Sequence, residues 1–129
     1  MHHRDTEAPS DSEITQKIIG AAIEVHRSSG LLESAYEESL CYELAQLRLG
    51  FEHQVPLPVV YKGVKLDCGY RMDIVVKDQI VIEIKSIEAI ADIHEAQCPT
   101  YLKFSGKQLC LLLNFNTLLM KDGIKRFVH

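Results

Sequence analysis

Two acidic residues and one lysine lie in the most apolar part of the chain, residues 70–86 (YRMDIVVKDQIVIEIKS). The pattern predicts two short strands joined by a three-residue loop at 77–79, which places Asp73 directly opposite Glu83. Lys85 lies on the same face of its strand as Glu83. Like charges about 5 Å apart across a strand pair are destabilising by themselves. A divalent cation held by both carboxylates is the simplest explanation for the pair.

A plain surface salt bridge from Asp73 to Arg71 or Lys85 is the alternative, and it would contribute at most ~1 kcal/mol. It does not explain why Glu83 and Lys85 interrupt a run as apolar as IVIEIKSI. We therefore favour a metal-competent site over a structural ion pair.

Length and composition predict one domain. The chain has 129 residues, 47% hydrophobic and 25% charged, which is enough apolar material for one core. Residues 1–11 are polar and aperiodic and are expected to form a flexible tail before a single domain at 12–129. The net charge of −4 argues against a dedicated non-specific DNA binder. It leaves open a metal-dependent site acting on nucleic acid, because bound cations are not in that count.

The four cysteines show no CxxC spacing, and three of them lie in apolar or helical segments. Buried free thiols in a reducing compartment are therefore expected. No apolar run approaches the ~18 residues of a membrane span. The polar residues 1–11 do not resemble a signal peptide, so none is expected. We expect a soluble, cytoplasmic protein without a membrane partner.

The elements that must position the acidic pair follow from periodicity and turn signals. They form an α-α-β-β-β-α-β order with an added last strand, an α/β (α+β) domain with a mixed sheet. The expected helices are 12–27, capped by Asp11 or Ser12, 31–49, and 89–104, the last begun or interrupted by Pro99. The expected strands are an edge segment at 51–61, a short continuation at 64–68, the two strands within 70–86, a strand covered on both faces at 109–115, and 124–128.

The second helix carries a further acid on its apolar side. At about 100° per residue, Glu33 falls on the stripe of Leu40, Leu44 and Leu47, with Glu37 on the same side. Two interpretations of Glu33 stay open. A first-turn acid favours the helix dipole. It could also point across the core towards the carboxylates of the sheet.

Several ordered motifs resemble one known family. Residues 30–36 (GLLESAY) form a GxxExxY motif, followed by YKG at 61–63, YRMD at 70–73, EIK at 83–85 and LLLNF at 111–115. Over residues 14–128 the chain resembles the GxxExxY protein family, which is assigned to the PD-(D/E)xK nuclease-like superfamily. The resemblance implies a restriction-endonuclease-like αβββαβ core, with a mixed sheet flanked by helices.

The resemblance also implies roles for individual residues. Asp73, Glu83 and the carbonyl of Ile84 would bind Mg²⁺ or Mn²⁺. Glu33 would supplement the metal site and count with the catalytic residues, and Glu37 is the neighbour that could replace it. Lys85 would orient or deprotonate the attacking water, or stabilise charge on the phosphate. The reaction implied is hydrolysis of a nucleic acid phosphodiester by metal-activated water, on DNA rather than RNA.

Supporting residues are expected on the third helix, where Gln97 and Tyr101 share a face. They resemble the QxxxY element of RecB-type nucleases, and a partly buried amphipathic face is an equal alternative. His26 and His94 are the histidines near the predicted face. A lone histidine is more often a hydrogen-bonded structural group than a ligand, so His94 stays open as a candidate ligand and His26 less so.

Two other functions remain as alternatives. The first is a non-catalytic binding or assembly module that retains the nuclease-like fold, which the acidic net charge favours. The second is a nuclease subunit that works as a homodimer, or with a partner that supplies affinity for DNA.

Overall fold

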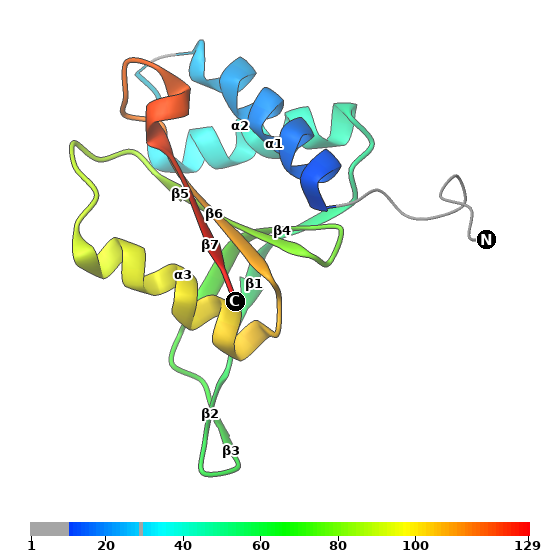
Figure 1. The fold of residues 1–129 in the computed structure, drawn as a ribbon, viewed down its shortest axis with the longest axis vertical. Helices are drawn as coiled ribbons and strands as arrows, with labels where there is room; N and C mark the ends of the chain where they lie inside the picture. Colours follow the sequence, from blue (N-terminus) through cyan, green and yellow to red (C-terminus); the bar gives the residue numbers. More distant parts are fainter. Residues whose placement is uncertain (1–10, 29) are drawn as a thin grey trace.

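A five-stranded mixed sheet lies at the centre of the structure, a computed structural model that describes residues 11–28 and 30–129 (Figure 1). The tail predicted at 1–11 therefore lies outside the described residues except for Asp11. The strand order is β1-β4-β5-β6-β7, with β5 and β6 parallel and the other neighbours antiparallel. The strands are β1 Phe51–Pro56, β4 Arg71–Val76, β5 Ile80–Lys85, β6 Leu109–Asn114 and β7 Ile124–Val128.

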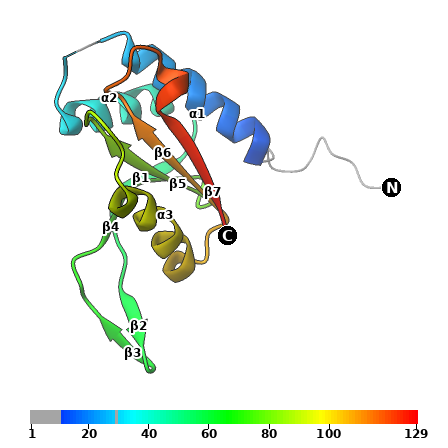
Figure 2. The same ribbon diagram turned by 60° about the vertical axis from the view of Figure 1, so that its left-hand side comes forward.

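Helices cover both faces of this sheet. Helices α1 (Asp11–His26) and α2 (Glu33–Gln46) pack together on one face, and α3 (Asp92–Ser105) covers the other (Figure 2). A parallel strand pair needs a crossover connection, which α3 provides between β5 and β6. The mixed α/β class and the αβββαβ core order are confirmed.

Two hydrophobic cores result, one on each face of the sheet. Ile74, Ile82 and Leu111 belong to the core under α1 and α2. Val75 and Val81, from alternating positions of the same strands, belong to the core under α3. All six residues of β6 are buried, as predicted for a strand covered on both faces. β1 is an edge strand, as predicted, but the expected segment 51–61 was too long, because residues 59–61 belong to a separate sheet.

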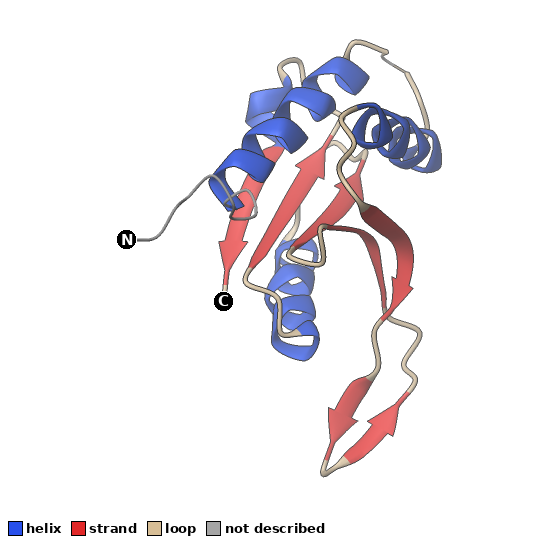
Figure 3. Ribbon diagram, turned by 90° about the vertical axis from the view of Figure 1, so that its right-hand side faces the viewer, coloured by secondary structure: helices blue, strands red, loops and turns tan. Residues whose placement is uncertain are grey.

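A second, two-stranded sheet projects away from the helices (Figure 3). It is the hairpin of β2 (Val59–Tyr61) and β3 (Val64–Leu66), inserted between β1 and β4. Its turn has positive φ at both central residues, 51° at Lys62 and 79° at Gly63. That is the geometry of a type I′ turn, and glycine supplies one of the two positions without strain.

Two helix predictions were wrong in their bounds. The second helix spans Glu33–Gln46 rather than 31–49, because the chain leaves it at Leu47 and Arg48 adopts a φ of 58°. The third helix runs unbroken from Asp92 to Ser105, so Pro99 neither begins nor interrupts it. Pro99 is exposed, and the buried residues Tyr101 and Leu102 hold this turn against the sheet.

The prediction of buried free thiols is confirmed for three of the four cysteines. Cys41, Cys98 and Cys110 are buried free thiols, whereas Cys68, near the base of the projecting hairpin, is exposed. Burial raises the pKa of the Cys41 thiol to about 11. Among the described residues, no helix is long and apolar enough to span a membrane.

A close backbone contact closes the loop between β6 and β7. A Cβ atom added at the buried Gly123 would lie 2.0 Å from the carbonyl oxygen of Asn114. We expect Gly123→Ala to lower the free energy of unfolding by about 1–3 kcal/mol, because the backbone must move. Gly20→Ala in α1 is the matched control. It meets nothing within 4 Å and should raise stability by about 0.5–1 kcal/mol. Urea unfolding measures both, and equal effects would contradict the assignment.

Candidate active site

Asp73 and Glu83 lie where the hydrogen-bonded ladder between β4 and β5 ends. The ladder pairs Val76 with Ile80, Val75 with Val81 and Ile74 with Ile82, the register predicted from a three-residue loop. The next position in this register is Asp73 opposite Glu83. There the side chains take over the pairing of the strands. The N–H of Asp73 donates to Oε2 of Glu83 at 3.0 Å, and the N–H of Ile84 donates to Oδ2 of Asp73 at 2.8 Å.

The β1–β4 ribbon twists sharply at this level. Met72 and Ile74 are two residues apart, yet Met72 packs in the core under α3 and Ile74 in the core under α1 and α2. In β1, Phe51 and Val55 are divided between the same two cores, and Gln54 between them has a φ of 54°. In a flat strand, residues at even spacing share one face. The twist therefore separates β4 from β5 and opens the space that the carboxylates occupy.

Burial disfavours the charged forms of both acids. Glu83 is 2% exposed, and burial together with the charge of Asp73 raises its pKa to about 9. Burial likewise raises the pKa of Asp73 to about 6, with further increases from Glu37 and Glu33 that the hydrogen bond from Ile84 and the charge of Lys85 oppose. Lys85 also acts to lower the pKa of Glu83. Both raised pKa values reflect the cost of ionising two neighbouring acids in a buried space, a cost that a bound cation would relieve.

The donor atoms fit a hard divalent cation. Each carboxylate uses one oxygen to accept a backbone N–H, and within the described residues the other oxygen, Oδ1 of Asp73 and Oε1 of Glu83, accepts no hydrogen bond. No group of three or more His, Cys, Asp or Glu side chains suited to a metal occurs in the described part of the chain. Mg²⁺ is commonly held by one or two carboxylates, with water and substrate phosphate completing its shell. Two acids are therefore sufficient protein ligands, and the Ile84 carbonyl stays a predicted one.

The alternative of a plain salt bridge is not what the structure shows. In the described residues, Asp73 forms no ion pair within 4.0 Å with Arg71 or Lys85. Lys85 is partly buried at the end of β5, and its charge acts on both carboxylates, so it lies beside the pair without bonding to it.

Helix α3 brings Tyr101 and Gln97 to this face of the sheet. Burial raises the pKa of Tyr101 to about 12, and the nearby charges of Glu83 and Asp73 add to the effect. Gln97 and Tyr101 line one cavity of about 290 Å³, and Oε1 of Gln97 is buried without a hydrogen-bond partner among residues 11–28 and 30–129. Tyr70 lines the same cavity, and the centroid of its ring lies 6.1 Å from that of Tyr101. The sequence did not suggest this contact.

Glu33 does not lie where its helical spacing placed it. It is exposed, so the prediction that it extends the buried leucine stripe was wrong, and Leu47 at the other end of the stripe is 42% exposed. Tyr36 fills the buried position of the first turn instead. The charge of Glu33 still raises the pKa of Asp73, though less than that of Glu37.

Glu37 is less exposed than Glu33, and its carboxylate is hydrogen-bonded. Its side chain is 12% exposed and accepts hydrogen bonds from Nε2 of Gln54 at 3.1 and 2.9 Å. Nδ1 of His53 lies 3.9 Å from the same carboxylate. Sequence analysis missed Gln54 and His53, because nothing in an edge strand signals that its side chains will reach a helix on one face of the sheet.

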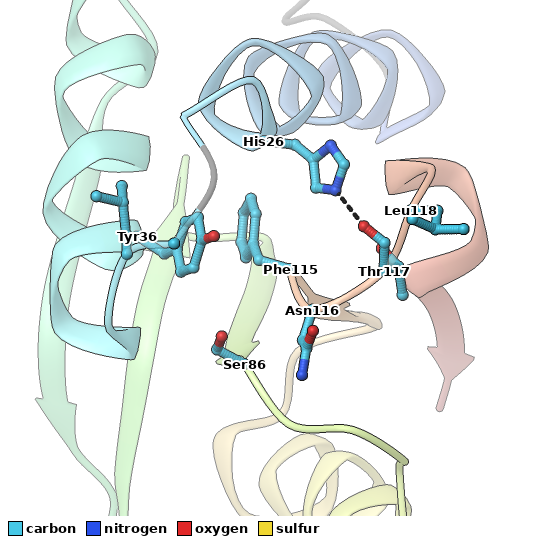
Figure 4. A pocket seen from close by; sticks show the side chains of 9 residues that line it. His26, Tyr36, Ser86, Phe115, Asn116, Thr117 and Leu118 are labelled. Atoms are coloured by element: carbon cyan, nitrogen blue, oxygen red, sulfur yellow. Dashed lines mark hydrogen bonds between the residues drawn. The ribbon is translucent and has the colours of Figure 1, made fainter.

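The glycine and tyrosine of the GxxExxY motif have structural roles. Gly30 has a φ of 82°, and the buried ring of Tyr36 stacks on Phe115 with centroids 4.5 Å apart (Figure 4). Gly30 and Tyr36 line a cavity of about 390 Å³ beyond the carboxyl ends of β5 and β6. Nε2 of His26 donates to the Thr117 carbonyl at 2.6 Å across it (Figure 4). The motif thereby fixes the start of α2, from which Glu33 projects.

Both histidines considered as ligands have hydrogen-bond partners, as expected for structural groups. His26 bonds to Thr117, and Nδ1 of His94 accepts the N–H of Ala91 at 2.9 Å in the first turn of α3.

Comparison with known proteins gives one match. The family model of the PD-(D/E)XK nuclease superfamily matches residues 12–127. No curated protein and no solved structure matches the chain.

The raised pKa values predict how stability depends on pH without metal. The folded protein holds protons that the unfolded chain releases above a pKa near 4, so its free energy of unfolding should fall as the pH rises through the interval up to about 9. Glu83→Gln removes most of this loss and should raise stability at pH 8 by about 1–3 kcal/mol, since one pKa unit corresponds to about 1.4 kcal/mol. Urea unfolding in EDTA at pH 5 and pH 8 measures the effect.

The exposed Glu88→Gln is the control and should leave the pH dependence unchanged. A wild-type stability that does not fall between the two pH values would contradict the burial of an ionisable pair.

Proposed function

Because the chain belongs to the PD-(D/E)XK nuclease superfamily, we propose that it hydrolyses phosphodiester bonds of nucleic acid, with DNA as its substrate and Mg²⁺ or Mn²⁺ as its cofactor. One observation carries the proposal. Asp73 and Glu83 face each other with raised pKa values, one uncommitted oxygen each, and Lys85 beside them. Structural ion pairs do not leave two acids in this state, whereas a metal-dependent hydrolase needs them.

Each residue has a defined task in this proposal. Asp73 and Glu83 hold the cation, with the Ile84 carbonyl as a further oxygen ligand. When bound, the cation lowers the pKa of a water and neutralises charge on the phosphate. Lys85 orients that water or stabilises the charge that develops on the phosphate oxygens. The two backbone hydrogen bonds keep the carboxylates in place before metal arrives.

The residues around this centre position it. Tyr101 and Gln97 line the α3 side and hold Lys85 and the substrate in place. Glu37, fixed by Gln54, and Glu33 add negative charge from the α2 side and increase the attraction for a cation.

A non-catalytic binding or assembly module is the second candidate. The net charge of −4 favours it, because most nucleic acid enzymes of this size need basic surface to hold their substrate. Cleavage assays separate the two functions.

The central prediction concerns metal and cleavage together. Asp73→Asn and Glu83→Gln should abolish Mn²⁺ binding in calorimetry and cleavage of supercoiled plasmid. Lys85→Met should keep the metal and lose about 10²-fold or more in cleavage rate, as expected when a group that stabilises the transition state is removed. The exposed Glu88→Gln controls for preparation.

Two results would count against this function. Wild-type protein that binds neither metal would exclude it. Cleavage that copurifies equally with Glu83→Gln would identify a contaminant and favour the binding module.

Glu37 and Glu33 should differ in their effect on the metal. Glu37 is held by two hydrogen bonds and acts more strongly on Asp73, so Glu37→Gln should weaken Mn²⁺ binding several-fold and Glu33→Gln less. Calorimetric titration of the two variants measures the ranking. The reverse order would assign the supporting role to Glu33.

A further inference from the structure

The projecting β2–β3 hairpin is basic in an acidic chain. The hairpin, residues 59–66, contains Lys62 and Lys65 and no acid, a net charge of +2 where the whole chain carries −4, and Arg71 follows at its base in β4. None of these three cations forms an ion pair with another described residue. Other described cations, such as Lys17 and Lys121 on the body of the domain, also form no ion pair with a described residue, so the hairpin is distinguished by having cations with no acid among them. The hairpin therefore carries positive charge that the protein itself does not neutralise.

The hairpin also exposes an apolar surface. Its register pairs Val59 with Leu66 and Tyr61 with Val64, so these four side chains share one face. Tyr61 is 60% exposed, Val64 56% and Leu66 41%. An isolated two-stranded hairpin is at best marginally stable in water, and its apolar face is normally covered by another layer. Here that face has no covering layer within the described structure.

The hairpin is continuous with the candidate active site. It extends the β1–β4 ribbon, in which Pro56 pairs with Arg71 and the N–H of Leu57 donates to the Tyr70 carbonyl at 2.9 Å (Figures 2 and 3). Arg71 at its base is two residues from Asp73. At about 3.3 Å per strand residue, the tip reaches roughly 20–30 Å from Asp73. The hairpin and the carboxylates therefore lie on one continuous ribbon.

We propose that the β2–β3 hairpin is an arm that binds double-stranded DNA in a groove beside the cleaved bond. The apolar face with Tyr61 packs against the bases. Lys62 at the turn and Arg71 at the base contact phosphates, and Lys65, on the opposite face from Tyr61, reaches a phosphate past the edge of the ribbon. This proposal rests on the proposed function, because it supplies the affinity for substrate that the acidic domain lacks.

Charge and shape together select duplex DNA over a protein partner. Three cations without acidic partners match the regular phosphate charge of a duplex. A two-stranded ribbon has the width of the major groove, about 12 Å, and apolar side chains on such elements also wedge between base steps in the minor groove. Lys62, whose Nζ lies 5.5 Å from the centroid of the Tyr61 ring, places a cation beside the aromatic group at the tip.

The test measures binding separately from cleavage. Lys62→Glu/Lys65→Glu should weaken binding to a fluorescent 30-base-pair duplex at least 10-fold in EDTA at low salt. It should also reduce the magnitude of the negative slope of log K against log salt by about 2. Lys17→Glu/Lys121→Glu, on exposed positions of α1 and the 3-10 helix Met120–Gly123, makes the same change in net charge elsewhere and should weaken binding less than 3-fold. Equal losses in the two variants, or no loss in the first, would overturn the proposal.

Two further measurements separate this proposal from the alternatives of single-strand binding and a dimer contact. A fluorophore on the exposed Cys68 should respond to duplex but not to a single strand of equal length. If Tyr61→Ser/Val64→Ser turns a sedimenting dimer into a monomer and leaves duplex affinity unchanged, the hairpin is a dimer contact and the proposal is wrong. Binding that depends on the arm in a protein that cleaves nothing would uphold the arm and refute the nuclease. If Lys62→Glu/Lys65→Glu leaves duplex binding unchanged and the protein cleaves DNA, the nuclease is upheld and the arm is refuted.

Discussion

The structure depends on two hydrogen bonds that join β4 to β5 through carboxylates instead of backbone carbonyls. Oδ2 of Asp73 accepts the N–H of Ile84, and Oε2 of Glu83 accepts the N–H of Asp73. These bonds hold the strands together where their ladder ends, and they bring two acids into a buried space where both resist ionisation. The arrangement costs stability, which the two apolar cores offset. A protein retains such local strain where function needs it.

The two layers of helices contribute to this site from different directions. Tyr101 comes from α3, above the face on which Glu83 lies, whereas Glu37 comes from α2, which packs on the opposite face. Glu37 can influence Asp73 because β1 twists at Gln54, whose side chain binds it. The edge strand thus connects the two layers. A site between two splayed strands is reached from both faces of a sheet, which no single helix of an α/β domain can achieve.

The centre of the site could be predicted from the sequence, and its surroundings could not. Side-chain alternation and a three-residue loop suffice to place Asp73 opposite Glu83, because both are local properties. The burial of β6 followed from its unbroken apolar run. The prediction that Glu33 extends the buried stripe was wrong. Helical periodicity assigns a residue to a face, but it does not show that Tyr36 would occupy the buried position of that turn. The role of Gln54 could not be predicted, because its positive φ within a strand is not indicated by its residue type, as it would be for glycine or asparagine.

The raised pKa values give the acidic composition a different meaning. A formal charge of −4 counts Asp73 and Glu83 as ionised, but a pKa of about 9 keeps Glu83 protonated at neutral pH until a cation replaces the proton. The site therefore repels a phosphate backbone less than the formal charge suggests, and under the proposed function a bound cation would attract that backbone. The unpaired cations of the hairpin lie away from this exchange, so they remain positive in both states. In the two proposals above, substrate affinity and metal affinity would reside in separate parts of one ribbon, the first at its tip and the second at its base. Because Asp73 and Arg71 share β4, a twist that sets the carboxylates also sets the direction in which the arm points.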